Sequence, residues 1–180
     1  TVIVQRAGDV IPQVVQVVVK KRQPNSKRYI FPSHCPACGS KALRHEGEVV
    51  WRCSGGMACS AQAIERLCHF VGRDAFDIEG IGEKQMEDFW LCGLVRSPSD
   101  LFRLRKVGEK IEEREGWGKV SVENLLSAVD RRRHISLERF LYSLGIRMVG
   151  QATAKLLAQT YRGYSEFEEA LLRSADESSG

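Results

Sequence analysis

The chain has 180 residues, of which 43% are hydrophobic, 8% aromatic and 28% charged, and its formal net charge is +4. This composition is typical of a globular protein with room for one to three small units. No apolar run approaches the roughly 18 residues of a membrane helix, which argues against a membrane protein. No Ser-His-Asp order, Walker loop or dinucleotide fingerprint is visible, so we predict no catalytic residue in this chain.

Residues 1–33 predict two strands followed by a polar loop. Thr1–Arg6 and Val14–Val19 are rich in β-branched residues, and Gly8-Asp9 between them is a turn signal. Because two strands are not stable alone in water, we expect them to be the end of a small barrel that needs further strands. The region carries six basic residues against one acid, which suits contact with phosphate, although solvated surface lysines are equally ordinary.

Residues 34–60 contain four of the six cysteines, in the pattern C-x2-C, fourteen residues, C-x5-C. Two such pairs, returned by a short hairpin, place four thiolates around one zinc ion. Gly39 and Gly47 can turn the chain, and Val49–Trp51 predicts the returning strand. Four sulfurs leave no open coordination position, so the predicted zinc is structural. Its predicted ligands are Cys35, Cys38, Cys53 and Cys59.

Two alternatives use the same residues. Two disulfides would also consume four cysteines, but the high charge and the absence of a signal peptide favour zinc. His34 or His45 could replace one sulfur. We expect the remaining cysteines, Cys68 and Cys92, to be small buried apolar residues in helices.

From Ser60, a predicted N-cap, the pattern is helical. Three times an apolar-periodic helix leads into a glycine-bearing turn and a second helix. The first glycine relieves an unusual backbone angle, the central apolar residue packs between the helices, and the second glycine opens the next helix. The turns are residues 78–84, 114–120 and 144–151.

Such a turn leaves backbone N–H groups at a helix N-terminus, which is a surface that suits phosphate. One glycine turn is often purely steric, but three in series can follow the backbone of a duplex. Contacts of this kind do not identify bases, so we predict binding that is independent of sequence. The basic cluster Arg131–His134 is either a further phosphate contact or a solvated helix end.

At this point the chain closely resembles bacterial NAD-dependent DNA ligases, in order and along nearly its whole length. The residues that carry the resemblance are RAGDVIPQVV (6–15), FPSHCPACG (31–39), RCSGG (52–56) with Cys59, HFV (69–71), DIEGIGEK (77–84), DLF (100–102) and RFLYSLGIR (139–147).

The resemblance implies a mainly α fold with small β parts. Residues 1–33 would be the truncated end of an OB-fold domain and a linker, residues 34–60 a four-cysteine zinc finger, and residues 61–180 a helix-hairpin-helix domain with three hairpins and a truncated fourth. It further implies a parent enzyme of replication and repair that uses NAD and Mg²⁺ to seal nicks between a 3′-hydroxyl and a 5′-phosphate. Since the adenylation domain is absent here, this chain alone should not ligate.

The resemblance also implies which residues meet the partner, double-stranded and preferably nicked DNA. Arg6 would contact the backbone, while Val10 and Ile11 would press on the sugars. In the second hairpin, Gly108 upstream leaves open which glycine pair meets DNA. The full set implied is Arg6, Val10, Ile11, Gly80, Gly82, Lys84, Gly116, Gly118, Lys119, Gly145, Arg147 and Gly150.

Two other functions remain possible for the same motifs: an independent zinc and hairpin module of another repair protein, or a protein–protein scaffold in which zinc and glycines are only structural. The Arg6–Pro12 segment favours the ligase, because a free-standing module has no need of part of a barrel. We expect a monomer in the bacterial cytoplasm, associated with the nucleoid.

Overall fold

The computed structural model describes residues 1–8 and 11–177. Val10, one of the residues predicted to meet DNA, lies outside the described residues. The chain divides into two compact units, Thr1–Ser33 and His34–Gly180. Helices dominate and the strands are short, which confirms the predicted mainly α fold with small β parts.

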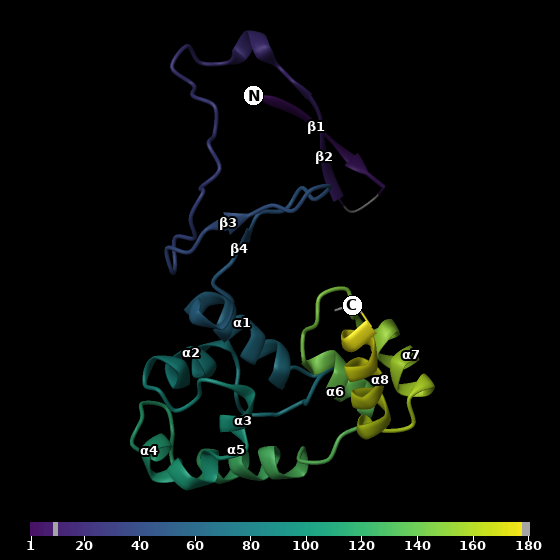
Figure 1. The fold of residues 1–180 in the computed structure, drawn as a ribbon. Coiled ribbons are helices and arrows are strands. Elements are labelled where there is room, and N and C mark those ends of the chain that lie inside the picture. Colours follow the sequence, from purple (N-terminus) through teal and green to yellow (C-terminus); the bar gives the residue numbers. More distant parts are fainter. Residues whose placement is uncertain (9–10, 178–180) are drawn as a thin grey trace. The chain divides into compact units, whose positions relative to one another are not determined.

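The first unit is a two-stranded antiparallel ribbon. Strand β1 (Val2–Ala7) pairs with β2 (Ile11–Val17), from Val2 opposite Val17 to Ala7 opposite Ile11 (Figure 1). The second strand therefore begins three residues earlier than predicted, because pairing continues up to the turn. A short 3-10 helix, η1 (Val19–Lys21), follows. The described strand side chains are exposed on both faces, since this unit has no second layer to cover the ribbon.

The second unit starts with a small hairpin. Strand β3 (Ala42–Leu43) pairs with β4 (Arg52–Cys53), and the 3-10 helix η2 (Gly56–Ala58) follows. The prediction of a returning strand at Val49–Trp51 was wrong, because the paired residues come directly after it. The ladder forms where it brings Cys53 back to the first cysteine pair.

Eight α-helices and one 3-10 helix follow in the described chain. Helix α1 begins at Ser60, so Cys59 and not Ser60 occupies the N-cap position. No helix in the described residues is long and apolar enough to cross a membrane. The elements are α1 (Ser60–Val71), α2 (Glu83–Leu91), α3 (Pro98–Leu101), η3 (Leu104–Val107), α4 (Gly108–Glu112), α5 (Lys119–Arg131), α6 (Leu137–Ser143), α7 (Gln151–Thr160) and α8 (Tyr164–Glu177).

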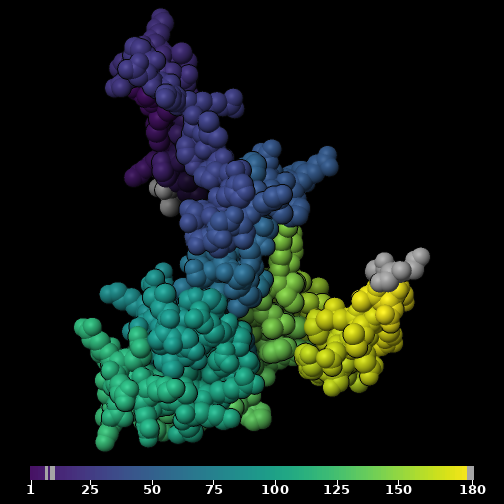
Figure 2. Space-filling view, turned by 60° about the vertical axis from the view of Figure 1, so that its left-hand side comes forward, coloured from purple at the N-terminus to yellow at the C-terminus, as the bar shows by residue number. Residues whose placement is uncertain are grey.

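These helices form two hydrophobic cores. The larger one joins α1, α2, α3, α4 and α5 and includes Leu67, Phe89 and Leu125, each with no exposed surface. The smaller one, in the second part of the helical chain, is built on Leu141, Ala154 and Phe167. Figure 2 shows the same division, with the teal residues in one lobe and the yellow residues of α8 at the edge of another.

Polar contacts connect the two cores. The His69 ring of α1 hydrogen-bonds the carbonyl oxygen of Tyr142 at 2.8 Å. Arg139 of α6 donates from Nε to the carbonyl oxygen of Ala75 at 2.8 Å. Phe140 packs against both cores. The third hairpin is thus attached to the first by a few specific contacts.

The two cysteines outside the finger differ from each other. Cys68 is partly buried against the larger core, close to what its helical pattern predicts, and burial raises the pKa of its thiol. The prediction that Cys92 is buried was wrong. Cys92 follows the last residue of α2 and is exposed, because the apolar face of that helix is already occupied by Met86, Phe89 and Trp90.

Candidate zinc centre and nucleic-acid interface

Four sulfur atoms converge at the base of the finger. The Sγ atoms of Cys35, Cys38, Cys53 and Cys59 all lie within 4.8 Å of one another. The Cys38–Cys53 pair is separated by 3.4 Å and the Cys35–Cys59 pair by 4.0 Å. A tetrahedral zinc with bonds of about 2.3 Å requires sulfurs about 3.8 Å apart. The cluster therefore fits one tetrahedral ion.

Local backbone geometry creates this cluster. The N–H of Cys35 donates to the carbonyl oxygen of Ser40 at 2.8 Å, and Gly39, with φ of +71°, closes the turn that contains the first two cysteines. Helix η2 then carries Cys59 back to the centre. All four cysteines are free, so the disulfide alternative is not supported. Among the described residues the cluster contains neither His34 nor His45.

Hydrogen bonds and crowding have opposite effects on the thiols. The hydroxyl and N–H of Ser40 lower the pKa of Cys38 to about 6. The N–H of Gly55 also favours the thiolate of Cys53, but burial and hydrogen bonding with the other cysteines raise its pKa to about 12. The two shifts have opposite directions because a hydrogen bond between these thiols favours the thiolate of Cys38 and the protonated form of Cys53. A divalent cation favours the thiolate form and displaces the protons.

Gly55 is a residue of this centre that the sequence reasoning missed. A Cβ atom at this position would lie 2.9 Å from Oγ of Ser40 and 3.0 Å from Sγ of Cys38. Its N–H also donates to Sγ of Cys53 at 3.2 Å. The residue is therefore glycine because the sulfur cluster leaves no space for a side chain. The only signal in the sequence is its place between the last two cysteines.

The first two glycine turns have the predicted construction. Gly80 and Gly116 have φ of +89° and +81°, the left-handed region in which glycine is favoured. Gly82 and Gly118 occupy the N-cap positions of α2 and α5. Between the glycines, Ile81 is 6% exposed and belongs to the larger core, and Trp117 packs partly buried against it.

The third turn is longer and different. Gly145 has φ of +61° and Gly150 is the N-cap of α7, but the residues from Ile146 to Val149 separate them, where the other turns have one residue. Here Val149 packs against the smaller core, while Ile146 and Met148 are 45% and 86% exposed. The apolar plug of this hairpin is thus the residue directly before the second glycine.

Gly108 is not a hairpin glycine. It is the first residue of α4, has a helical φ of −53°, and a Cβ there would meet Leu126 and Val122 of α5. Gly116 and Gly118 form the turn between α4 and α5. A side-chain methyl at position 108 would make ordinary packing contacts with α5 at 3.6 and 3.8 Å.

Side chains within the helices occupy some of the N–H groups expected to be free. The N–H of Gly82 donates to Oε1 of Gln85 at 3.1 Å, and that of Gly118 donates to Oγ of Ser121 at 2.9 Å. The groups left for a ligand are those of the next three residues, since a first helical turn has no intrahelical acceptors for them. The capping-box spacing of Gln85 and Ser121 could have revealed this in the sequence.

The cations next to these turns differ in whether they form an ion pair. Lys84 and Lys119 are exposed, and in the described part of the chain neither forms an ion pair. Arg147, in the third turn, is paired with Glu48 of the finger, which also binds Arg52. The acid that holds Arg147 could not be identified from the sequence, because about 100 residues separate the two.

In the first unit, Arg6 lies in β1 opposite Pro12, and Ile11 is the first residue of β2. Both side chains are exposed. Because Ile11 pairs with Ala7, the residue next to Arg6, the two side chains lie at the same end of the ribbon but on opposite faces, and their contact with DNA stays a prediction.

Comparisons with known proteins agree with these motifs. Residues 34–61 match the family model of the NAD-dependent DNA ligase C4 zinc finger domain, and residues 139–175 match the helix-hairpin-helix motif. The chain is 54% identical to a DNA ligase of Nitrobacter winogradskyi, over 97% of this chain and 25% of that protein. A DNA ligase of Brucella ovis is 52% identical over 100% of this chain and 26% of its own length. Over nearly its whole length the chain therefore matches a fragment of DNA ligases, and its finger matches the one found in NAD-dependent DNA ligases.

The match covers very different shares of this chain and of its relatives. The chain spans about a quarter of the length of the relatives it matches. The similarity includes the first unit as well as the finger and the helices, since it covers 97–100% of the chain. This disfavours a free-standing zinc and hairpin module of another repair protein.

Proposed function

We propose that this chain binds double-stranded DNA without reading its sequence, as part of an NAD-dependent DNA ligase. The contacts would come from the N-terminal ends of α2, α5 and α7. Positive helix ends and unpaired N–H groups attract phosphate, and phosphate contacts carry no base information. The exposed Lys84 and Lys119 add charge beside the first two of these ends.

One observation carries this proposal: two of the glycines in the hairpin turns have no structural reason to be glycine. Gly118 and Gly150 have φ of −150° and −84° in extended backbone, which any residue can adopt. No atom lies within 4 Å of a Cβ built at either position. Asp, Asn or Ser would cap these helices better. Gly163 is equally unconstrained but lies outside the hairpin turns. At Gly118 and Gly150 the missing side chain coincides with a helix N-terminus in a repeated turn, which supports close approach of a ligand.

We assign the zinc to Cys35, Cys38, Cys53 and Cys59, as a structural ion. A centre closed by four sulfurs offers no position for substrate, so zinc would supply folding energy and no chemistry. Residues 1–33 would be the end of an OB-fold domain, residues 34–60 the finger, and residues 61–180 the helix-hairpin-helix domain. Arg6 and Ile11 would add contacts from the first of these.

The parent enzyme, on this proposal, seals nicks between a 3′-hydroxyl and a 5′-phosphate during replication and repair. NAD and Mg²⁺ would act outside the residues of this chain, so the chain alone binds DNA but does not ligate. The grip would favour nicked DNA and require no second copy of the protein. Because its substrate is the chromosome, the enzyme would work in the cytoplasm, at the nucleoid.

The test adds a negative charge at the helix ends. Gly118→Asp and Gly150→Asp preserve or raise stability, because Asp is a favoured N-cap, but repel phosphate. Gly163→Asp is the matched control, since its carbonyl oxygen accepts the N–H of Phe167 at the start of α8, outside the three hairpin turns. We expect each hairpin variant to lower affinity for a nicked duplex about tenfold in fluorescence anisotropy, with the control unchanged.

A salt titration completes the test. Affinity should fall steeply with salt, because each phosphate contact releases a counterion, and the two hairpin variants should show a shallower slope. Unchanged affinity in both variants, or an affinity insensitive to salt, would leave the glycine turns as purely steric features and favour the protein–protein scaffold.

A further inference from the structure

A second possible binding site lies away from the hairpin glycines. It is a cavity of about 530 Å³ lined by the rings of Phe76, Phe102, Phe140 and Tyr164 and by Arg133 and His134, and we refer to it as the aromatic cleft. Its volume is in the range of small-molecule sites, roughly 300–1,000 Å³. The lining comes from α6, α8, the turn after α1, the residue after α3 and the segment after α5.

The walls of the cleft are held in place. The rings of Phe76 and Phe102 meet edge to face at 5.4 Å, and those of Phe140 and Tyr164 at 5.6 Å. The hydroxyl of Tyr164 donates to Oε1 of Glu168 at 3.0 Å. That bond engages the polar end of the tyrosine, so the ring contributes an aromatic surface to the cleft. Ring walls of this kind favour a planar aromatic ligand.

Arg133 contributes a fixed cation. Its Nε donates to Oδ1 of Asp130 at 2.9 Å, its Nη2 donates to the carbonyl oxygen of Phe102 at 2.7 Å, and its guanidinium lies 5.6 Å from the centre of the Phe102 ring. Among the described residues no bond is made by Nη1. The arginine is therefore already oriented and keeps two N–H donors for a ligand.

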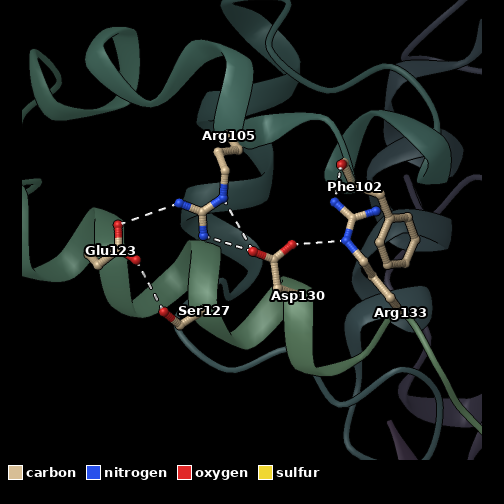
Figure 3. Close-up of polar contacts among 6 residues, drawn as sticks. All are labelled: Phe102, Arg105, Glu123, Ser127, Asp130 and Arg133. Carbon is tan, nitrogen blue, oxygen red and sulfur yellow. Dashed lines mark hydrogen bonds and ion pairs between the residues drawn. The ribbon is translucent and has the colours of Figure 1, made fainter.

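The charges around Arg133 alternate. Figure 3 shows Glu123, Arg105, Asp130 and Arg133 in a row, with Phe102 beside the last. Oδ2 of Asp130 accepts a hydrogen bond from Arg105, and Oδ1 accepts one from Arg133. At the far end of the row, Oε2 of Glu123 lies 3.8 Å from Nη1 of Arg105. The end of the row that borders the cleft is positive, which favours an anionic group there.

We propose that the aromatic cleft binds a small planar aromatic carboxylate, with its ring among the four aromatic side chains and its carboxylate on Nη1 of Arg133. The cleft joins residues of both helical cores, since Phe76 belongs to the larger core and Phe140 packs against both. A ligand in the cleft therefore contacts the turn after α1, through Phe76, and helix α6 of the third hairpin, through Phe140. This site uses none of the hairpin glycines, so it is tested without DNA and independently of the proposed function.

The probe is 2-naphthoate, titrated into the zinc-loaded full chain and followed by amide chemical shifts and calorimetry. Arg133→Gln should weaken binding about tenfold, because it removes a charge-assisted hydrogen bond. Tyr164→Ala removes a wall at a half-exposed position and should weaken binding several-fold. Arg131→Gln is the matched control, with the same change of charge two residues away, at an exposed position that does not line the cleft.

The expected result is saturable binding with shifts in residues 133–140 and around Tyr164, lost in both cleft variants and kept in the control. The uncharged analogue 2-naphthalenemethanol should bind about tenfold more weakly than 2-naphthoate. Absence of saturable binding, equal affinity in Arg133→Gln, or equal affinity for the uncharged analogue would overturn the proposal. Melting curves of each variant show whether a loss comes from unfolding.

Discussion

The finger and the helical part of the chain are stabilised in different ways. Among residues 34–59 only Cys59 is buried, and the hairpin has two paired residues on each strand. Residues 60–177 instead bury two clusters of apolar side chains, and Leu67, Phe89 and Leu125 of the larger one have no exposed surface. The finger has little core to hold it, so its folding energy must come from a bound ion.

The glycines of the two regions are required for different reasons. Gly55 is required by the space around the sulfurs and Gly80 by its backbone angle, whereas Gly118 is required by neither. Only the last kind points to an external partner. Four predictions, in order of decreasing effect, test the contrast between metal-stabilised and core-stabilised regions.

Removal of zinc should have the largest effect, and only on the finger. A structural zinc contributes about 10–16 kcal/mol at neutral pH in small fingers. Chelation or Cys53→Ser should therefore unfold residues 34–59 while the helices keep their circular dichroism. Cys92→Ser, at an exposed position outside the centre, is the control. Simultaneous loss of helix signal and zinc would show that the two regions are not independent.

A core truncation should act on the helices alone. Leu125→Ala should lower the free energy of unfolding by about 2–5 kcal/mol, because Leu125 has no exposed surface and packs beside Gly80. Val120→Ala, on the same helix but 75% exposed, should change it by less than about 0.5 kcal/mol. Denaturant titration measures both, and zinc content should stay at one ion per chain in each.

Gly55→Ala should weaken the zinc centre without removing a ligand. The added Cβ displaces Ser40 or Cys38, and disturbed support around ligands typically costs about 10–100-fold in metal affinity. Competition with a coloured chelator measures this. Ser54→Ala, at the exposed neighbouring position, should leave the affinity unchanged. Wild-type affinity in Gly55→Ala would mean that the centre adjusts to the extra atom.

The smallest effect is expected from the ion pair between Asp88 of α2 and Arg114 in the turn after α4. The hydrogen bonds from Arg114 lower the pKa of Asp88, so the pair stabilises the fold above the ordinary aspartate pKa of 3.8 and loses this contribution as the pH falls through the lowered value. Asp88 is 40% exposed, so Asp88→Asn should cost under about 1 kcal/mol at pH 7. The difference in unfolding free energy between Asp88→Asn and wild type should disappear once the pH falls below the lowered pKa of Asp88. Thermal unfolding at pH 7 and at that acidic pH measures this.

The sequence by itself determined the features that depend on residues close in the chain. The spacing of the cysteines indicated one four-sulfur centre, and each helix–glycine–helix pattern indicated a turn, because chain geometry over a few residues is set locally. Boundaries were less accurate: the strand expected at Val49–Trp51 formed at Arg52–Cys53, where pairing with β3 could be made.

Only the tertiary structure decided contacts between distant residues. It determined that Glu48 holds Arg147, that His69 binds the backbone of Tyr142, that Cys92 is exposed, and that rings from four separate segments line the aromatic cleft. The physical reason is that such contacts depend on how packed helices orient side chains that are tens of residues apart. A local pattern records which face of a helix is apolar, but it does not record which partner covers that face.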